Sequence, residues 1–410
     1  MNPASYSIIG LDLVPSTGGP AKTIRYFSEA YNGKVYSLTN ERKLQIEGSS
    51  FKPITHYTYQ NTPWKNLTSY IDKEKQEALL KELSLSSIIS CHILYRYHVH
   101  LVNKLYIKKS IPYVVVPHGC LDPYTLGKNK LLKKLWFSYI GKQFLRQASA
   151  VIFSTNKERE KASFLLKNCR TTVMHWPTPF LDISRKANCK VEFLKRHNLP
   201  LNSRIAVSLG RLHTMKNPLM IVEAFAKANL ENTYLFLVGP EENIKISAIK
   251  TYLSQFPNSA KIIIKGPLWG KEKEELLLAS DLYISMSVRE NFGHTLAESL
   301  SAGLYYIASE GNYLAHDLPL GEGGTILKEN TTPALVKALV KWDQLPKSSC
   351  KEIGIKNQRW VEQNLKFETF ATKIKRLYNS IIDRKVALDY SFEPTFTHQT
   401  NRNQAFQSKK

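Results

Sequence analysis

The segment 285–303 carries the residues best suited to chemistry. It reads Ser-Met-Ser-Val-Arg-Glu-Asn-Phe-Gly-His-Thr-Leu-Ala-Glu-Ser-Leu-Ser-Ala-Gly, so that Glu290 and Glu298 stand eight positions apart. The apolar run 282–286 predicts a buried strand, which ends in a loop at Glu290 before Gly293 leads into a helix. Ligands of open α/β sheets bind at such strand ends. Free N–H groups at a helix start suit an anionic phosphate, and the Glu298 carboxylate offers acceptors for hydroxyl groups.

The spacing of the two glutamates says little by itself, because such pairs also arise by chance and place a glutamate on a solvated helix face. Their neighbours say more. Asn291, Phe292 and Gly293 after the first glutamate, with Ala-Glu-Ser-Leu-Ser-Ala-Gly around the second, resemble retaining glycosyltransferases of the GT-B fold, glycosyltransferase family 4. The resemblance extends over residues 5–380 and is strongest over 205–310. It implies that Glu290 and the backbone of 291–293 hold the donor sugar, and that Glu298 binds the nucleotide ribose.

A second motif follows the apolar run 205–209, where Arg211 and Lys216 stand five positions apart in Gly-Arg-Leu-His-Thr-Met-Lys. In the family, this arginine and lysine hold the diphosphate of a nucleotide-sugar donor. Cationic side chains suit that role because the leaving nucleoside diphosphate gains negative charge as the glycosidic bond breaks. Without the glutamate motif, both residues would be interpreted as ordinary surface cations.

The first half of the chain supplies two weaker matches. Gly18 and Gly19 follow the first apolar run, where the family places a glycine pair near the donor phosphates, although such pairs also form ordinary turns. His118 stands in Pro-His-Gly after another apolar run, and the family often has a histidine there that faces the transferred sugar. The alternative for His118 is a buried histidine with satisfied hydrogen bonds. One departure is the segment 175–178, His-Trp-Pro-Thr, where the family commonly has Asn-Gly-Val-Asp.

The resemblance implies a retaining, metal-independent hexosyltransferase with Glu290 and His118 at the reacting centre. Retention in this family is usually explained without a protein nucleophile: the acceptor hydroxyl attacks from the face that the leaving group departs, and a donor phosphate oxygen takes its proton. The nucleotide sugar is then a co-substrate, and we expect neither a cofactor nor a metal. The Asp-x-Asp motif that holds a metal in the other main glycosyltransferase fold does not occur among the nine aspartates of the sequence.

Short apolar runs that predict strands recur along the chain. They cover 6–11, 88–94, 113–116, 151–154, 205–209, 234–238, 261–264, 282–286 and 305–309. Continuous rather than alternating apolarity is typical of parallel strands that helices cover on both faces. Helical patterns separate most of these runs, and Asn217-Pro218 and Thr332-Pro333 each offer an N-cap followed by proline at the first helical position. The pattern predicts an α/β protein with doubly wound sheets.

Prolines and polar residues interrupt this rhythm at 176–179 and again at 198–200, which predicts an extended linker with one short helix. We therefore expect two Rossmann-like, doubly wound domains that face a cleft, as in the GT-B fold. The first (1–180) would bind the acceptor and the second (181–366) the nucleotide sugar. A C-terminal helix at 367–384 and a polar, disordered tail at 385–410 would follow.

The charge is strongly unbalanced, with 57 Lys and Arg against 34 Asp and Glu and a net charge of +23. Such an excess favours polyanionic partners, and it is densest at 101–150, where Asp122 alone opposes nine cations. Within it, 128–146 alternates lysines with Leu131, Leu132, Leu135, Trp136, Tyr139 and Phe144. One interpretation is an amphipathic helix on an anionic membrane surface. The other is a domain helix that buries its leucines and tryptophan and leaves its lysines in solvent.

The remaining features bear on location and on alternative functions. Five widely spaced cysteines without C-x-x-C favour a reducing cytosol. We expect neither a signal peptide nor a membrane span. The protein would therefore be cytoplasmic or peripheral on the inner membrane face. Its partners would be a nucleotide sugar and a saccharide or lipid-linked acceptor, in the biosynthesis of cell-envelope polysaccharide, lipopolysaccharide or exopolysaccharide. Two alternatives stay open. One is a nucleotide-sugar epimerase of the same fold. The other is a basic nucleic-acid-binding protein, although the sequence has no recognisable nucleic-acid-binding motif. We expect His98 and His100 to lie in a loop or strand rather than in a metal site.

Overall fold

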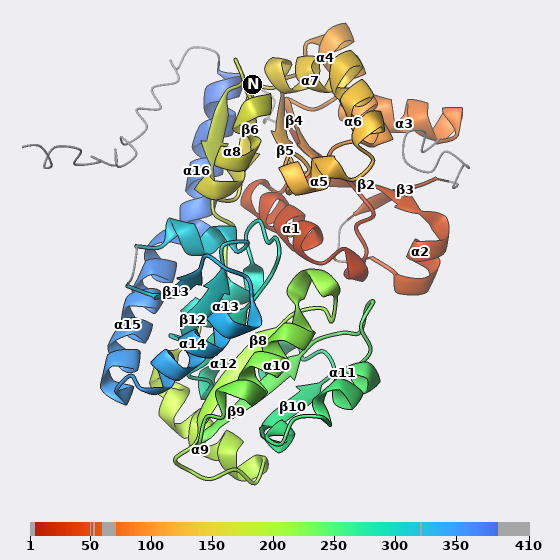
Figure 1. The fold of residues 1–410 in the computed structure, drawn as a ribbon. Coiled ribbons are helices and arrows are strands. Elements are labelled where there is room, and N and C mark those ends of the chain that lie inside the picture. The colour runs from red at the N-terminus through yellow and green to blue at the C-terminus, as the bar shows by residue number, and fades with distance from the viewer. Residues whose placement is uncertain (1–4, 50, 52–53, 60–70, 320–321, 384–410) are drawn as a thin grey trace, which may run out of the picture.

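The computed structural model describes residues 5–49, 51, 54–59, 71–319 and 322–383, so the expected tail at 385–410 lies outside the described residues. It contains two Rossmann-like domains, each built on one parallel sheet with helices packed around it (Figure 1). The two-domain α/β architecture predicted from the sequence is confirmed.

The sheet of the N-terminal domain has the order β3-β2-β1-β4-β5-β6-β7, and all of its paired strands are parallel. Its strands are β1 (Tyr6–Leu11), β2 (Lys34–Asn40), β3 (Thr55–Tyr59), β4 (Ile88–His92), β5 (Tyr113–Val116), β6 (Ala150–Phe153) and β7 (Thr171–Val173). The helices that connect them are α1 (Gly19–Tyr31), α2 (Glu41–Glu47), α3 (Lys73–Leu83), α4 (Tyr97–Lys109), α5 (Pro123–Gly127), α6 (Lys130–Trp136), α7 (Lys142–Gln147) and α8 (Asn156–Ala162). The direction of the strand order reverses between β1 and β4.

The sheet of the C-terminal domain has the order β10-β9-β8-β11-β12-β13, again with parallel pairs, and reverses between β8 and β11. Its strands are β8 (Arg204–Leu209), β9 (Thr233–Val238), β10 (Ile262–Lys265), β11 (Leu282–Ser285), β12 (Tyr305–Ser309) and β13 (Gly324–Leu327). Its helices are α9 (Lys186–Arg196), α10 (Pro218–Ala228), α11 (Ile246–Leu253), α12 (Gly270–Ala279), α13 (His294–Ser301), α14 (Thr332–Asp343) and α15 (Lys347–Asn364), and α16 (Phe367–Ile382) follows.

Every apolar run that predicted a strand contains one, with ends that shift by at most two residues. The strands β2, β3, β7 and β13 carried no such signal. They read KVYSLTN, THYTY, TTV and GTIL, and hydroxyl-bearing or other polar residues break up their apolarity. Three of them, β3, β7 and β13, are outermost strands of their sheets, where burial on both faces is incomplete and the apolar signal is weak.

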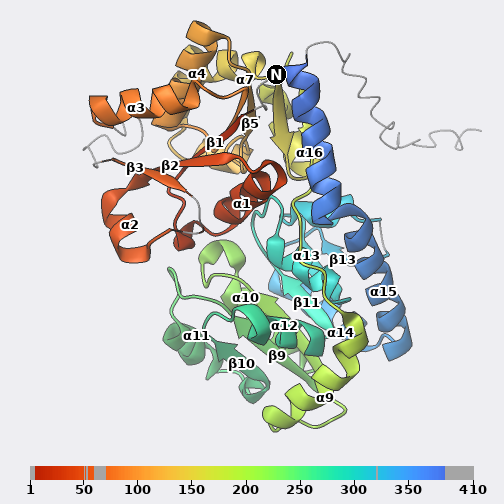
Figure 2. The same ribbon diagram turned by 180° about the vertical axis from the view of Figure 1, so that it is seen from behind.

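The last helix returns to the first domain. Figure 2 shows α15 along the C-terminal domain and α16 continuing beside α1 of the N-terminal domain. Phe370 on α16 packs edge-on against Phe27 of α1, with ring centroids 5.2 Å apart, and against Trp176 of the linker at 6.2 Å. All three rings are buried. The apolar cluster that they form continues into both domains, so the two sheets do not have separate cores on this side.

Two sequence expectations need correction. His98 and His100 lie in the first turn of α4 rather than in a loop or strand, and the His98 ring is buried with its Nε2 at 2.9 Å from the carbonyl of His92. The basic segment 128–146 is not one continuous helix: α6 ends at Trp136, a π-helical turn, η2 (Phe137–Gly141), follows, and α7 continues from Lys142. Among the described helices, none has the length and apolarity needed to cross a bilayer.

The Phe27–Trp176–Phe370 contact allows a stability test. Replacing Phe370 with Ala removes a buried aromatic ring and leaves a cavity between the domains, which typically costs about 3–5 kcal/mol. We expect a clearly lower midpoint in thermal or denaturant unfolding followed by tryptophan fluorescence. Leu201→Ala, at a side chain that is 60% exposed, serves as the control and should unfold like the wild type. A wild-type midpoint for Phe370→Ala would show that α16 does not brace the domains.

Candidate functional site

The carboxyl ends of both sheets face each other and enclose a cavity of about 310 Å³. The loops after β1 and β5 reach it from the N-terminal domain, and the loops after β8 and β11 reach it from the C-terminal domain. The loops after β1, β8 and β11 lie at the points where the strand order reverses, which is where open α/β sheets bind ligands. Nine of the ten residues singled out in the sequence line this cavity: Gly18, Gly19, His118, Arg211, Lys216, Glu290, Asn291, Phe292 and Gly293.

Hydrogen bonds join the two loops of the C-terminal domain side by side. The Val288 N–H donates to the Met215 carbonyl at 2.9 Å, and the Asn217 side chain donates to the Met286 carbonyl at 2.8 Å. The loop after β11 is fixed from its other side as well, because the Glu290 N–H donates to the Gly311 carbonyl at 2.7 Å. These bonds bring two residues 74 positions apart into contact, and the Lys216 ammonium pairs with the Glu290 carboxylate.

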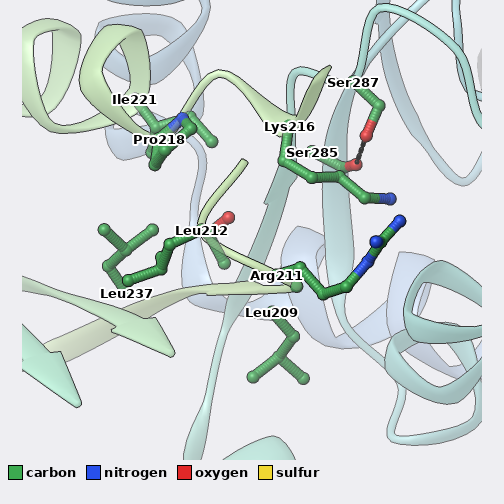
Figure 3. Close-up of a pocket in the computed structure, with 11 residues that line it drawn as sticks. Leu209, Arg211, Leu212, Lys216, Pro218, Ile221, Leu237, Ser285 and Ser287 are labelled. Atoms are coloured by element: carbon green, nitrogen blue, oxygen red, sulfur yellow. Dashed lines mark hydrogen bonds between the residues drawn. The ribbon is translucent and has the colours of Figure 1, made fainter. Parts of the chain in front are cut away.

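Arg211 extends beside Lys216. Figure 3 shows the two side chains running to the same side of the loop with their nitrogen-bearing ends close together. A small hollow of about 10 Å³ lies at their base, lined in part by Ser285 and Ser287. The Arg211 guanidinium is 59% exposed and forms two hydrogen bonds with Glu242, at 2.8 and 2.9 Å. Since an exposed ion pair contributes little net stability, this arginine can exchange Glu242 for a ligand at low cost.

Lys216 and Arg289 make the middle of the cavity cationic. Burial, together with the neighbouring positive charges of Arg211 and Arg289, lowers the pKa of Lys216 to about 8. Arg289 donates from Nη1 to the Gly119 carbonyl of the other domain at 2.9 Å, and its Nε is buried with no partner among the described residues. One carboxylate, Glu290, faces these cations, so the lining retains excess positive charge for an anionic ligand.

Gly293 turns the loop into α13. It has φ 71° at the N-cap, a left-handed conformation that favours glycine, and no side chain caps the helix. The first N–H groups of α13 therefore remain available beside the cavity, and the partial positive charge of the helix start favours an anion there. Phe292 is buried with its ring 6.4 Å from that of Trp176, which anchors the loop against the linker.

The Pro-His-Gly loop after β5 meets the 290–293 loop from the opposite domain. Gly119 has φ 74°, and a Cβ built on it would lie 1.9 Å from the side-chain nitrogen of Asn291, so only glycine permits this approach. The Gly119 N–H donates to the buried Glu158 carboxylate at 2.8 Å. The Thr155 hydroxyl donates to the Asn291 carbonyl at 3.1 Å, which adds a second polar link between the domains.

His118 is held within this loop by a second histidine. Its Nε2 lies 2.9 Å from Nδ1 of His92, and Nε2 of His92 lies 2.9 Å from the Ser90 hydroxyl. Desolvation lowers the pKa of His118 to about 3 and also lowers that of His92. Both rings are therefore neutral near pH 7, and one donates to the other. As the alternative interpretation expected, one ring nitrogen of His118 has a hydrogen-bond partner within the protein. The residue also lines the cavity.

Glu298 is the exception among the ten residues, since it does not line the cavity. It is 6% exposed, and its carboxylate pairs with Lys22 of α1 at 2.9 Å and with Lys273 of α12 at 3.1 Å. Desolvation alone would raise the pKa of Glu298, but the two lysines outweigh it and the pKa is lowered. The residue is thus neither on a solvated face nor open to a ribose hydroxyl in this arrangement. It links the two domains through Lys22.

Sequence reasoning missed several residues of the cavity, notably Arg289, His294 and His213. Arg289 and His294 directly flank the recognised 290–293 motif, and that adjacency was the available signal. Desolvation and Lys22 lower the pKa of His294 to about 3, so it stands as a neutral ring near Gly19. Trp176, noted in the sequence only as a departure, closes the cavity on the linker side. Among the described residues, no cluster of three or more His, Cys, Asp or Glu side chains could hold a metal ion.

The low pKa of Lys216 leads to a prediction on pH dependence. If Lys216 contacts a diphosphate, as its motif leads us to expect, affinity for a nucleoside diphosphate should fall as the pH rises past about 8, because the ammonium form is lost above its pKa. Lys216→Arg should keep its charge and lose less affinity over the same interval. Isothermal titration with UDP across that pH interval measures both, and parallel losses in wild type and variant would rule out Lys216 as the titrating group.

Comparison with known proteins agrees with this geometry. Residues 190–366, which contain Arg211, Lys216 and the 290–298 motif, match the family described as glycosyl transferases group 1. No curated protein matches the chain.

Solved structures match over almost the whole chain. Sucrose-phosphate synthase from Thermosynechococcus elongatus has a TM-score of 0.70 and 17% identity, with 93% of this chain and 100% of that chain covered. HepE from Anabaena, solved in complex with UDP and glucose, has a TM-score of 0.69 and 15% identity, with 92% and 100% covered. The α,α-trehalose 6-phosphate synthase from Burkholderia multivorans has a TM-score of 0.62 and 13% identity, with 93% and 100% covered. The protein therefore has the GT-B fold of these enzymes, and its residues 190–366 are similar to the glycosyl transferases group 1.

Proposed function

We propose that this protein is a retaining glycosyltransferase that moves a hexose from a nucleoside diphosphate sugar to a saccharide or lipid-linked acceptor. The observation that carries the proposal is the cavity between the domains, where Arg211 and Lys216 lie on one side of the 290–293 loop and His118 faces it from the other domain. The donor would lie chiefly on the C-terminal domain and the acceptor chiefly on the N-terminal domain.

The charges of the cavity suit the departure of a nucleoside diphosphate. In the transition state the bond between C1 of the sugar and the phosphate oxygen breaks, and negative charge accumulates on the diphosphate. Arg211, Lys216 and the free N–H groups at the start of α13 would stabilise that charge, so the reaction would need no metal. Gly18 and Gly19 would let the opposite backbone approach the phosphates closely.

The sugar would lie between Glu290, the backbone of 291–293 and His118. The acceptor hydroxyl oxygen bonds to C1 from the face that the diphosphate leaves, and the hydroxyl proton passes to a phosphate oxygen, so the anomeric configuration is retained without a protein nucleophile. Glu290 would accept hydrogen bonds from sugar hydroxyls once the donor diphosphate draws Lys216 away. His118, neutral and held by His92, would add a hydrogen bond to the sugar from the opposite domain.

The polar links between the domains suit a reaction that must exclude water. Three hydrogen bonds join the domains beside the cavity. They run from Arg289 to Gly119, from Thr155 to Asn291 and from Lys22 to Glu298. Closure of this kind limits hydrolysis of the donor. Glu298 would reach the nucleotide ribose only by giving up Lys22 or Lys273, so we propose that donor binding exchanges one of these ion pairs for ribose hydrogen bonds.

HepE was solved with UDP and glucose, and we therefore propose UDP-hexoses as the first donors to test. The proposed pathway is synthesis of cell-envelope polysaccharide, lipopolysaccharide or exopolysaccharide on the cytoplasmic side of the membrane.

Arg211 provides the test of the donor site. A panel of UDP-, GDP- and ADP-sugars should include one that raises the thermal unfolding midpoint of the wild type, because a bound ligand stabilises the folded state by mass action. Arg211→Ala should abolish that shift and lower transfer about 100-fold. Arg196→Ala is the matched control, since Arg196 is similarly exposed at 56% and pairs with Glu275 outside the cavity. Near-normal turnover in folded Arg211→Ala would sink the assignment.

Glu290 provides the test of the reaction. Glu290→Gln keeps the size of the side chain but removes the charge that opposes Lys216, and we expect transfer to fall at least about 100-fold while UDP still binds. Donor incubated without any acceptor should remain unchanged apart from slow hydrolysis, as followed by NMR of the anomeric proton. Conversion of the donor into an epimer under those conditions would instead identify a nucleotide-sugar epimerase.

A further inference from the structure

The segment α5–α6–η2 exposes apolar side chains to an unusual degree. Five of the fifteen large apolar side chains that are exposed among the described residues fall within residues 124–139. They are Tyr124 (42% exposed), Leu131 (71%), Leu132 (43%), Leu135 (47%) and Tyr139 (79%). Clustered exposure of this kind marks an interaction surface, whereas single exposed apolar residues are ordinary.

The folding of the segment explains which residues remain outside. Trp136, Phe137 and Phe144 are buried in the core of the N-terminal domain and hold the segment in place. Leu131, Leu135 and Tyr139 are spaced four apart, so they project from one face. Packing within the domain thus accounts for the tryptophan and the phenylalanines, but not for the leucines, which the alternative sequence interpretation also expected to be buried.

The charged residues of this segment are all positive. Lys130, Lys134 and Lys142 are exposed, and no acidic residue occurs between Asp122 and Glu158. Lys128 lies over the ring of Tyr124, with Nζ 5.1 Å from the centroid. Apolar side chains interleaved with lysines match the interface of an anionic bilayer, where the rings and leucines enter the acyl boundary and the ammonium groups reach the phosphates.

The surface also adjoins the cavity. Tyr124 of α5 donates its hydroxyl to the Met215 sulfur at 3.0 Å, and Met215 lines the cavity. The Arg289 guanidinium, which also lines the cavity, lies 6.0 Å from the Tyr124 ring centroid. In Figure 1, α5 is on the side of the N-terminal domain that faces the C-terminal domain, with α6 next to it. A bilayer in contact with α6 would therefore lie near the proposed acceptor side of the cavity.

We propose that the surface formed by Leu131, Leu132, Leu135, Tyr139, Lys130, Lys134 and Lys142 docks the protein on an anionic lipid bilayer. The apolar side chains supply the insertion, and the lysines supply the attraction to anionic headgroups. Docking further implies an acceptor that is anchored in the bilayer and reaches the cavity past α5. This second step rests on the proposed transfer reaction.

Vesicle co-sedimentation of the full chain tests the docking without relying on enzyme activity. The wild type should pellet with vesicles of phosphatidylglycerol and phosphatidylcholine at low salt, and about tenfold less with phosphatidylcholine alone or at high salt. Leu131→Ser/Leu135→Ser/Tyr139→Ser should lose at least about tenfold in partitioning. Leu201→Ser/Trp269→Ser removes two exposed apolar side chains of the other domain (60% and 70%) and should behave as wild type.

A charge series separates the lysines from the general basic character of the chain. Lys130→Glu/Lys134→Glu/Lys142→Glu should reduce binding to anionic vesicles about tenfold, whereas Lys337→Glu/Lys341→Glu/Lys351→Glu in α14 and α15 makes the same charge change and should have little effect. Wild-type protein that stays in the supernatant at low salt would overturn the proposal, as would equal losses in the two charge variants. So would a wild-type dimer, seen by sedimentation velocity, that the Leu131/Leu135/Tyr139 variant converts to monomer.

The thermal shift with nucleotide sugars keeps this proposal distinct from the proposed function. Folded surface variants should retain the wild-type shift, because none of the substituted residues lines the cavity. Vesicle binding without any nucleotide-sugar shift would remove the transfer reaction and leave the docking surface in place. A thermal shift with nucleotide sugars but no vesicle binding would remove the docking surface and leave the transfer reaction in place.

Discussion

The structure depends above all on keeping a half-buried lysine charged between two loops. The side chain of Lys216 is 23% exposed at the carboxyl edge of the second sheet, and burying an ammonium group is costly unless an anion compensates it. The Glu290 carboxylate provides that compensation. Hydrogen bonds between the loop after β11 and three residues, Met215, Asn217 and Gly311, keep the pair together. In the proposed function, a donor diphosphate would take over the role of this carboxylate, so that one anion replaces another beside Lys216.

The same principle explains why the domains meet where they do. Gly119 approaches Asn291 so closely that no side chain fits between them, and Arg289 reaches across to the Gly119 carbonyl. Lys22 supplies a cation to Glu298, which would otherwise be a buried carboxylate with one partner, Lys273, from its own domain. Arg289 and Lys22 each add a polar partner from one domain to a group of the other. The apolar cluster of Phe27, Trp176 and Phe370 then braces the closed arrangement on its other side.

Much of the fold could be predicted because strands buried on both faces have a conspicuous sequence signature. β1, β5 and β12 were predicted to the residue, while β3 and β7 carried too few apolar residues to be recognised. The nine cavity residues could be found because each lies in a short motif that follows an apolar strand. Lys22 could not, since its importance arises from Glu298, 276 positions away in the chain, whereas for Arg289 and His294 the only signal was their position beside the 290–293 motif. The sequence also could not decide whether Leu131, Leu135 and Tyr139 are exposed. Amphipathic periodicity shows that a helix has an apolar face, but not whether the domain covers that face.

The sequence alone determined the α/β class, the glycosyl transferases group 1 motifs and the excess of positive charge, because each of these is a property of local residue order or of composition. The tertiary structure decided which charges neutralise one another. It placed Glu298 between Lys22 and Lys273 instead of at the cavity, and it paired Lys216 with Glu290 across 74 positions of chain. Ion pairs and burial depend on distances in space, and the packing of the two sheets sets those distances.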